Sequence, residues 1–130
     1  MRVLLDANVV LALAGDPGRL RPEVVRLLGE GATTLVVSVV SPWEIAIKWK
    51  LGKLPLPDHP RPWIARFLRE TGAVVLPVAL EHVVQVADVP RHHGDPFDRL
   101  LIAQAQVEGM PIVTTDASFA RYDVDVITAR

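Results

Sequence analysis

The segment LVVSVVSPWE at residues 35–44 decides the fold class of this chain. Residues 35–40 are apolar at almost every position, which is typical of a strand buried on both faces of a parallel sheet. Ser41 and Pro42 then start a helix, because Pro is favoured in the first helical turn. A buried strand that runs directly into a helix indicates an α/β fold with a mostly parallel central sheet.

The same alternation of strands and helices continues on both sides of this segment. Strands are predicted over residues 3–5, 35–40, 73–78, 111–115 and 124–127, with the 73–78 strand buried and the last one a short edge strand. Helices are predicted over residues 7–14, 21–28, 41–51, 63–70, 80–87 and 95–108. No repeat or second domain interrupts the pattern, so residues 1–130 are expected to form one domain.

The composition excludes several classes of protein. With 50% hydrophobic and 22% charged residues, the chain is globular rather than disordered. It has no cysteine, so disulfides, thiolate metal sites and cysteine nucleophiles are excluded. Asp6 and Asn8 interrupt the amino-terminal apolar region, and no apolar run approaches the roughly 18 residues of a membrane span. These features predict a cytoplasmic protein without membrane association.

Four acidic residues are placed where they can converge. Asp6 and Asp116 directly follow predicted strands, and the carboxyl ends of parallel strands are where open sheets bind ligands. Glu44 and Asp98 lie in the first turns of helices that face the same edge. Two such charges about 4 Å apart repel by roughly 4 kcal/mol at an effective dielectric near 20, and a helix N-terminus offsets only about 0.3–1 kcal/mol. The cluster therefore favours a Mg²⁺ or Mn²⁺ site for metal-assisted phosphodiester hydrolysis.

Each acid also has a purely structural interpretation. Glu44 can close a capping box with Ser41, and Asp6, Asp95 and Asp116 can each cap the helix that follows. For a single acid, capping is the commoner role, and only the convergence of four favours chemistry. Similar alternatives apply to nearby polar residues: Asn8 and Thr115 can contact substrate or satisfy local backbone, and a structural role is favoured for Thr114. Trp43, Ile45 and Trp49 are expected in the core or an interface rather than as base-stacking platforms.

Four segments, in order along the chain, carry a resemblance to a known family. They are LLDANVVL at 4–11, SPWEIAIK at 41–48 with LGKL at 51–54, HGDPFDRLLIAQA at 93–105, and TTD at 114–116 with Phe119 and Tyr122. Together they resemble the PIN-domain ribonucleases, especially the VapC-type toxins of bacterial toxin–antitoxin pairs. The long segment at 93–105 is much more specific than any single acid-containing triplet.

The resemblance implies a three-layer α/β/α domain and a Mg²⁺- or Mn²⁺-dependent endoribonuclease. It also implies an RNA substrate, a homodimer, and inhibition by a small cognate antitoxin that binds DNA. Asp6, Glu44 and Asp98 match the three core acids of the family, and Asp116 matches its more variable fourth position. Asp95 belongs to the same motif and either joins the site or caps the helix that carries Asp98. Many relatives have Asn at the position of Asp116 and a further acid a few residues later, where this chain has Ser118-Phe119.

Substrate contacts are expected from Asn8, Thr115 and Arg99, the last being a cation beside Asp98 that can equally pair with a neighbouring acid. His92 and His93 can assist substrate binding, although loop histidines are usually plain surface residues. A local excess of basic residues can contact phosphates or simply form a solvated helix face. It consists of Lys48, Lys50, Lys53, Arg61, Arg66 and Arg69, against Asp58 alone.

Two other functions remain open from the residues. One is an aspartate-based phosphatase, for which Asp6 would be the nucleophile, but the second Asp of the usual Asp-x-Asp pair is replaced by Asn8. The other is a catalytically silent PIN-like binding module. That interpretation is weakened because the acids that a decayed enzyme tends to lose are all present.

Overall fold

A single parallel sheet of five strands organises the molecule, and the computed structural model describes all of residues 1–130. The strands are β1 (Arg2–Leu5), β2 (Thr34–Ser38), β3 (Val74–Leu76), β4 (Ile112–Thr114) and β5 (Val126–Thr128). In the order β3-β2-β1-β4-β5, strand β1 is central, and its Leu4 lies opposite Val36 on one side and Ile112 on the other. Every neighbouring pair is parallel, as the buried apolar strands predicted.

Helices follow the strands and cover the sheet. The α-helices are α1 (Ala7–Gly15), α2 (Pro22–Gly29), α3 (Val40–Lys50), α4 (Pro60–Thr71), α5 (Leu80–Gln85) and α6 (Pro96–Glu108). Three short 3-10 helices are η1 (Pro17–Arg19), η2 (Val86–Asp88) and η3 (Ala117–Arg121). None of the helices has the length and apolar character needed to cross a lipid bilayer.

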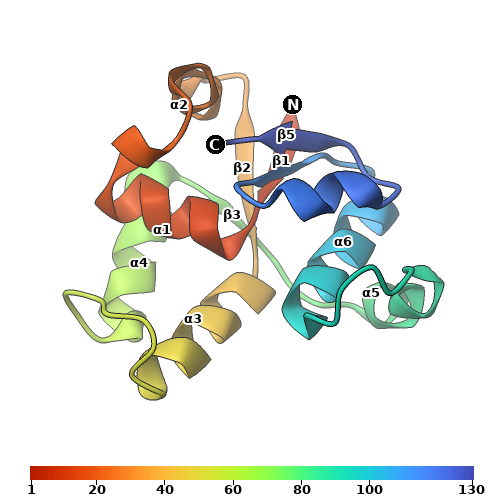
Figure 1. Ribbon diagram of the computed structural model, residues 1–130. Helices are drawn as coiled ribbons and strands as arrows, with labels where there is room; N and C mark the ends of the chain where they lie inside the picture. Colours follow the sequence, from red (N-terminus) through yellow and green to blue (C-terminus); the bar gives the residue numbers. More distant parts are fainter.

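Alternate residues of β1 enter two different cores, which makes the fold three-layered. Val3 and Leu5 pack into a cluster with buried side chains of α1, α2, α3 and α4. Leu4 packs into a second cluster that includes Ile102 of α6 and Phe119 of η3. Figure 1 shows the corresponding arrangement, with α1 to α4 on one side of the sheet and α5 and α6 on the other. The expected α/β/α architecture is confirmed.

Two details of the predicted strands are wrong. The strand expected to be buried over 73–78 is the short edge strand β3, and Val74 and Val75 are 50% and 44% exposed. It is exposed because β2 is its only partner in the sheet. The strand expected over 35–40 ends at Ser38, whose side-chain oxygen accepts the N–H of Val40 at 3.1 Å and turns the chain into α3.

Candidate active site

The carboxyl ends of β1 and β4 lie side by side at one edge of the sheet. There the hydroxyl of Thr114 contacts the side chain of Asp6 and the backbone of Asp116. Asp6 follows β1 and is only 4% exposed. Its Oδ1 accepts the N–H of Val9 at 2.9 Å and its Oδ2 accepts the hydroxyl of Thr114. The same hydroxyl oxygen accepts the N–H of Asp116 at 3.0 Å. Asp6 therefore caps α1 and is also fixed within a cluster, and the structural role expected for Thr114 is confirmed.

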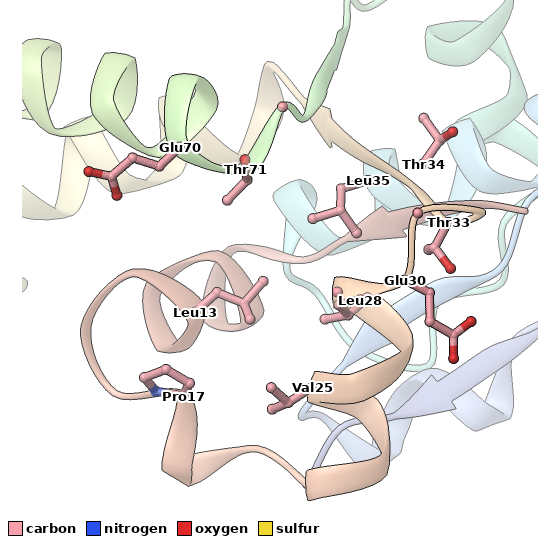
Figure 2. A pocket seen from close by; sticks show the side chains of 13 residues that line it. Leu13, Pro17, Val25, Leu28, Glu30, Thr33, Thr34, Leu35, Glu70 and Thr71 are labelled. Atoms are coloured by element: carbon pink, nitrogen blue, oxygen red, sulfur yellow. The ribbon is translucent and has the colours of Figure 1, made fainter.

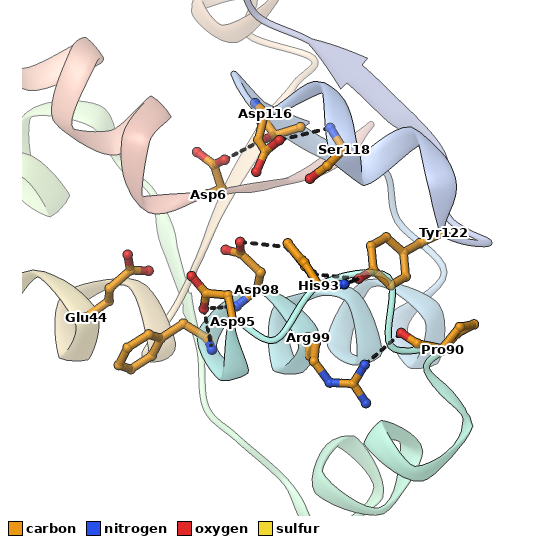
Figure 3. Close-up of polar contacts among 12 residues, drawn as sticks. Asp6, Glu44, Pro90, His93, Asp95, Asp98, Arg99, Asp116, Ser118 and Tyr122 are labelled. Atoms are coloured by element: carbon orange, nitrogen blue, oxygen red, sulfur yellow. Dashed lines mark hydrogen bonds and ion pairs between the residues drawn. The ribbon is translucent and has the colours of Figure 1, made fainter.

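The amino-terminal end of α6 brings further acids to this edge. Asp95 caps the helix, since its Oδ1 accepts the N–H groups of Phe97 and Asp98 at 2.9 and 3.1 Å. Asp98 lies in the first turn, and its Oδ2 is 3.2 Å from Nε2 of His93. Figure 3 shows Asp98 facing Asp6 and Asp116 across the site, with Glu44 approaching from α3.

Glu44 is not part of a capping box, so that structural interpretation of its role is wrong. Helix α3 begins at Val40, which places Ser41 inside the helix with its side chain buried. Glu44 instead forms an ion pair with Lys48 one turn later. This pair leaves Lys48 engaged with an acid of the cluster rather than free on a solvated helix face.

Burial and neighbouring negative charges raise the pKa of two of the acids, Asp98 and Asp6. Burial, together with the negative charges of Asp95 and Glu44, raises the pKa of Asp98 to about 7, while the charge of His93 opposes this shift. Burial also raises the pKa of Asp6, although the hydrogen bonds from Thr114 and Val9 lower it. Uncompensated negative charge at this edge is therefore costly, as the sequence predicted. Perturbed carboxylates that converge in this way are characteristic of functional sites.

The donor atoms at this edge fit a hard divalent cation. One potential ligand atom from each of His93, Asp98 and Asp116 lies within 4.8 Å of the other two. Nε2 of His93 is buried and has no aligned hydrogen-bond acceptor. Carboxylate oxygens suit Mg²⁺ or Mn²⁺, and a cation would relieve the repulsion that raises the pKa of Asp98.

The expected substrate contacts lie in two places. Asn8 and Thr115 line a hollow of about 260 Å³ beside the acids, together with Arg19 and Arg130. Arg99 is turned away from the acids: its guanidinium donates to the carbonyl oxygens of Pro90, Val86 and Val89, and Figure 3 shows it pointing toward Pro90. The interpretation of Arg99 as a cation of the cleft is therefore wrong, and its bonds fix the loop that precedes α6.

Sequence reasoning undervalued His93 and Tyr122. The hydroxyl oxygen of Tyr122 lies 2.6 Å from Nδ1 of His93 and also accepts the backbone N–H of His93 at 3.2 Å. The opposite ring nitrogen faces Asp98. A signal was present, because His93 stands two residues before Asp95, the residue that caps the helix carrying Asp98. His92, by contrast, is exposed and packs only the edge of its ring against Tyr122.

The apolar residues expected in the core or at an interface lie in different environments. Trp43 is 56% exposed and contacts Phe97 edge to face, with ring centroids 4.9 Å apart, so it is not a core residue. Ile45 is buried as expected. The largest hollow, about 620 Å³, lies apart from the acids between α1, α2 and α4, and Figure 2 shows Leu13 and Val25 lining it.

The sequence model of the PIN domain matches residues 3–125, almost the whole chain. The chain belongs to the PIN domain family. A search of curated protein sequences found no significant match.

Three of the similar structures come from toxin–antitoxin complexes. A chain of VapBC2 from Rickettsia felis, in a complex bound to a promoter DNA fragment, has a TM-score of 0.77 at 14% identity, with 100% of both chains covered. A chain of DNA-bound VapBC from Salmonella typhimurium has a TM-score of 0.72 at 14% identity over 98% of both chains. A chain of VapBC-5 from Mycobacterium tuberculosis has a TM-score of 0.62 at 20% identity over 98% of both chains. At these identities the likeness establishes the fold.

Proposed function

We propose that this chain, as one domain over residues 1–130, is a Mg²⁺- or Mn²⁺-dependent endoribonuclease. The observation that supports this most strongly is the convergence of Asp6, Glu44, Asp98 and Asp116 at one sheet edge, with the pKa of Asp98 raised to about 7. Asp6, Asp95 and Asp116 each accept a backbone N–H at the start of the helix that follows them. Capping does not explain why these acids gather with Glu44 and Asp98 at such electrostatic cost.

In this proposal the four acids hold the metal, directly or through water. A bound divalent ion would supply an activated water and would stabilise negative charge on the scissile phosphate. The hydroxyl of Thr114 fixes the position of Asp6 relative to Asp116, because it donates to the side chain of Asp6 and accepts the backbone N–H of Asp116. Asn8 and Thr115, which line the same hollow, would bind the phosphate backbone of the RNA.

We also propose that the protein acts in the cytoplasm as the toxin of a toxin–antitoxin pair, as a homodimer inhibited by a small cognate antitoxin. The PIN fold and its likeness to chains of VapBC complexes support this role. Exposed apolar residues on β3 and α5 offer surface that a protein partner can cover. They are Val74, Val75, Leu80, Val83 and Val84.

The experiment that tests the activity is cleavage of a defined structured RNA by antitoxin-free protein in Mn²⁺. A chelator and the Asp6→Asn variant are the controls, because Asn keeps a side-chain acceptor for the N–H of Val9 while it removes the charge. Cleavage that is lost in both controls supports the proposal. Cleavage that survives both contradicts it, and a folded protein that binds Mn²⁺ without cleaving any cellular RNA would favour a silent binding module.

A further inference from the structure

The loop before α6 holds the ring of His93 in one orientation from several sides. The ring packs edge-on to Phe119, with centroids 6.3 Å apart, and is tilted against Tyr122 at 5.4 Å. Arg99 binds three carbonyl oxygens of the preceding segment, which fixes the path of the loop. The imidazole is therefore not a mobile surface group, although it belongs to a loop.

The hydrogen bonds of Tyr122 favour one of the two neutral tautomers of His93. The hydroxyl oxygen of Tyr122 accepts the backbone N–H of His93, so its own proton is available for Nδ1, 2.6 Å away. No other acceptor for that hydroxyl proton is found in the structure. When Nδ1 accepts a hydrogen bond, the proton of the neutral ring lies on Nε2.

Nε2 of His93 is aimed at the acidic cluster. It is buried and lies 3.2 Å from Oδ2 of Asp98, but the two atoms are not aligned as a hydrogen bond. Asp98 is repelled by Asp95, Glu44 and Asp6, so a free Asp98 side chain would tend to rotate away from the cluster. The contact with Nε2 opposes this rotation and leaves Oδ1 available to a cation.

We infer that His93, oriented by the hydroxyl of Tyr122, is a positioning residue that holds Asp98 in the geometry needed to bind the metal ion. This inference rests on the proposed function. It adds His93 and Tyr122 to the proposed site, beside the four acids. Removal of a protein group that orients a metal ligand typically lowers metal affinity or activity by about 10–100-fold. His93 and Tyr122 are expected to have effects in that range.

The first test does not need metal or RNA. The ¹⁵N chemical shifts of the imidazole of His93 report its tautomer in the metal-free protein. We expect the proton on Nε2 in the wild type and a loss of this preference in Tyr122→Phe, which removes only the hydroxyl. A wild-type ring protonated on Nδ1, or a tautomer unchanged in Tyr122→Phe, would overturn the inference whatever the protein's activity.

The second test measures Mn²⁺ affinity and RNA cleavage in the same variants. His93→Ala and Tyr122→Phe are expected to weaken Mn²⁺ binding by about 10-fold or more and to lower kcat with little change in KM. His93→Gln, which restores a donor, should recover part of the affinity. His92→Ala is the matched control, because His92 also contacts Tyr122 but does not face Asp98, and it should behave as the wild type.

Unchanged Mn²⁺ affinity in His93→Ala, in a wild type that binds Mn²⁺ and cleaves RNA, would overturn the inference and leave the proposed function intact. A wild type that neither binds Mn²⁺ nor cleaves RNA would contradict the proposed function. That result would also overturn the inference, even if His93 shows the expected tautomer, because His93 is proposed to position a side chain that binds the metal.

Discussion

At one end of α6 His93 faces Asp98, and at the other end His82 binds Glu108. His82 is 2% exposed, and both of its ring nitrogens have partners: Nδ1 accepts the N–H of Ala79 at 2.9 Å and Nε2 lies 2.9 Å from Glu108. This pair joins α5 to α6 and leaves no ring nitrogen for a ligand. The His93 pair has the same chemistry, but its Nε2 lacks an aligned acceptor and its carboxylate lies among other acids.

The comparison shows that a histidine–carboxylate pair is not a functional signal by itself. What distinguishes the two pairs is the electrostatic environment, because Asp98 lies among other acids whose charges, together with burial, raise its pKa to about 7. The His82 pair is expected to contribute to stability, and the His93 pair to the chemistry of the site. Variants at the two ends of α6 can separate these roles.

The largest expected effect is on RNA cleavage. Asp98→Asn should lower it by more than about 100-fold, because it removes the carboxylate at the centre of the cluster that we propose as a metal ligand. Glu108→Gln, the matched change at the other end of the helix, should cleave at the wild-type rate. The measurement is the initial rate in Mn²⁺ on one RNA. Equal losses in both variants would contradict the assignment of different roles to the two pairs.

The next effect concerns folding stability. His82→Ala should reduce the free energy of unfolding by about 2–3 kcal/mol, since it leaves a cavity and deprives the partly buried N–H of Ala79 of its acceptor. Urea denaturation measures this loss, and Mn²⁺ affinity should remain unchanged. A His82→Ala protein with full stability would show that this pair does not hold α5 against α6.

The sequence predicted the arrangement of the backbone better than the contacts of individual side chains. Apolar periodicity predicted the parallel sheet, and strand and helix ends predicted the gathering of Asp6, Glu44, Asp98 and Asp116. The exposure of β3 was not predictable, because an apolar run does not reveal whether another strand lies beside it. The turn of Arg99 away from the acids depends on carbonyl groups of the segment just before α6, whose path the apolar pattern does not predict. The bond between His93 and Tyr122 joins residues 29 positions apart.

The smallest effect is a dependence of stability on pH in the absence of metal. Asp98 has a pKa of about 7 when folded and about 3.9 when unfolded, so the folded state binds the proton more tightly. Stability should therefore fall as pH rises from about 4 to 7 and then level off. After allowance for partial exposure of the side chain, the contribution is about 1–2 kcal/mol.

Urea denaturation of metal-free protein at several pH values, with Asp98→Asn as the comparison, isolates this contribution. The variant should be more stable than the wild type at pH 7.5, by about the same 1–2 kcal/mol, and nearly equal to it at pH 4. Glu108→Gln should keep the wild-type slope, because Asp98 is untouched. If Asp98→Asn destabilises the protein at pH 7.5, the account of mutual repulsion at this end of α6 is incorrect.

The central claim is that the acids around Asp98 bind a divalent cation, and thermal unfolding with and without Mn²⁺ at pH 7.5 tests it most directly. A ligand that binds only the folded state raises the melting temperature. The account predicts a rise in Tm for the wild type and for Glu108→Gln, and little or none for Asp98→Asn. A rise in Asp98→Asn equal to that of the wild type would place the metal elsewhere and contradict the account.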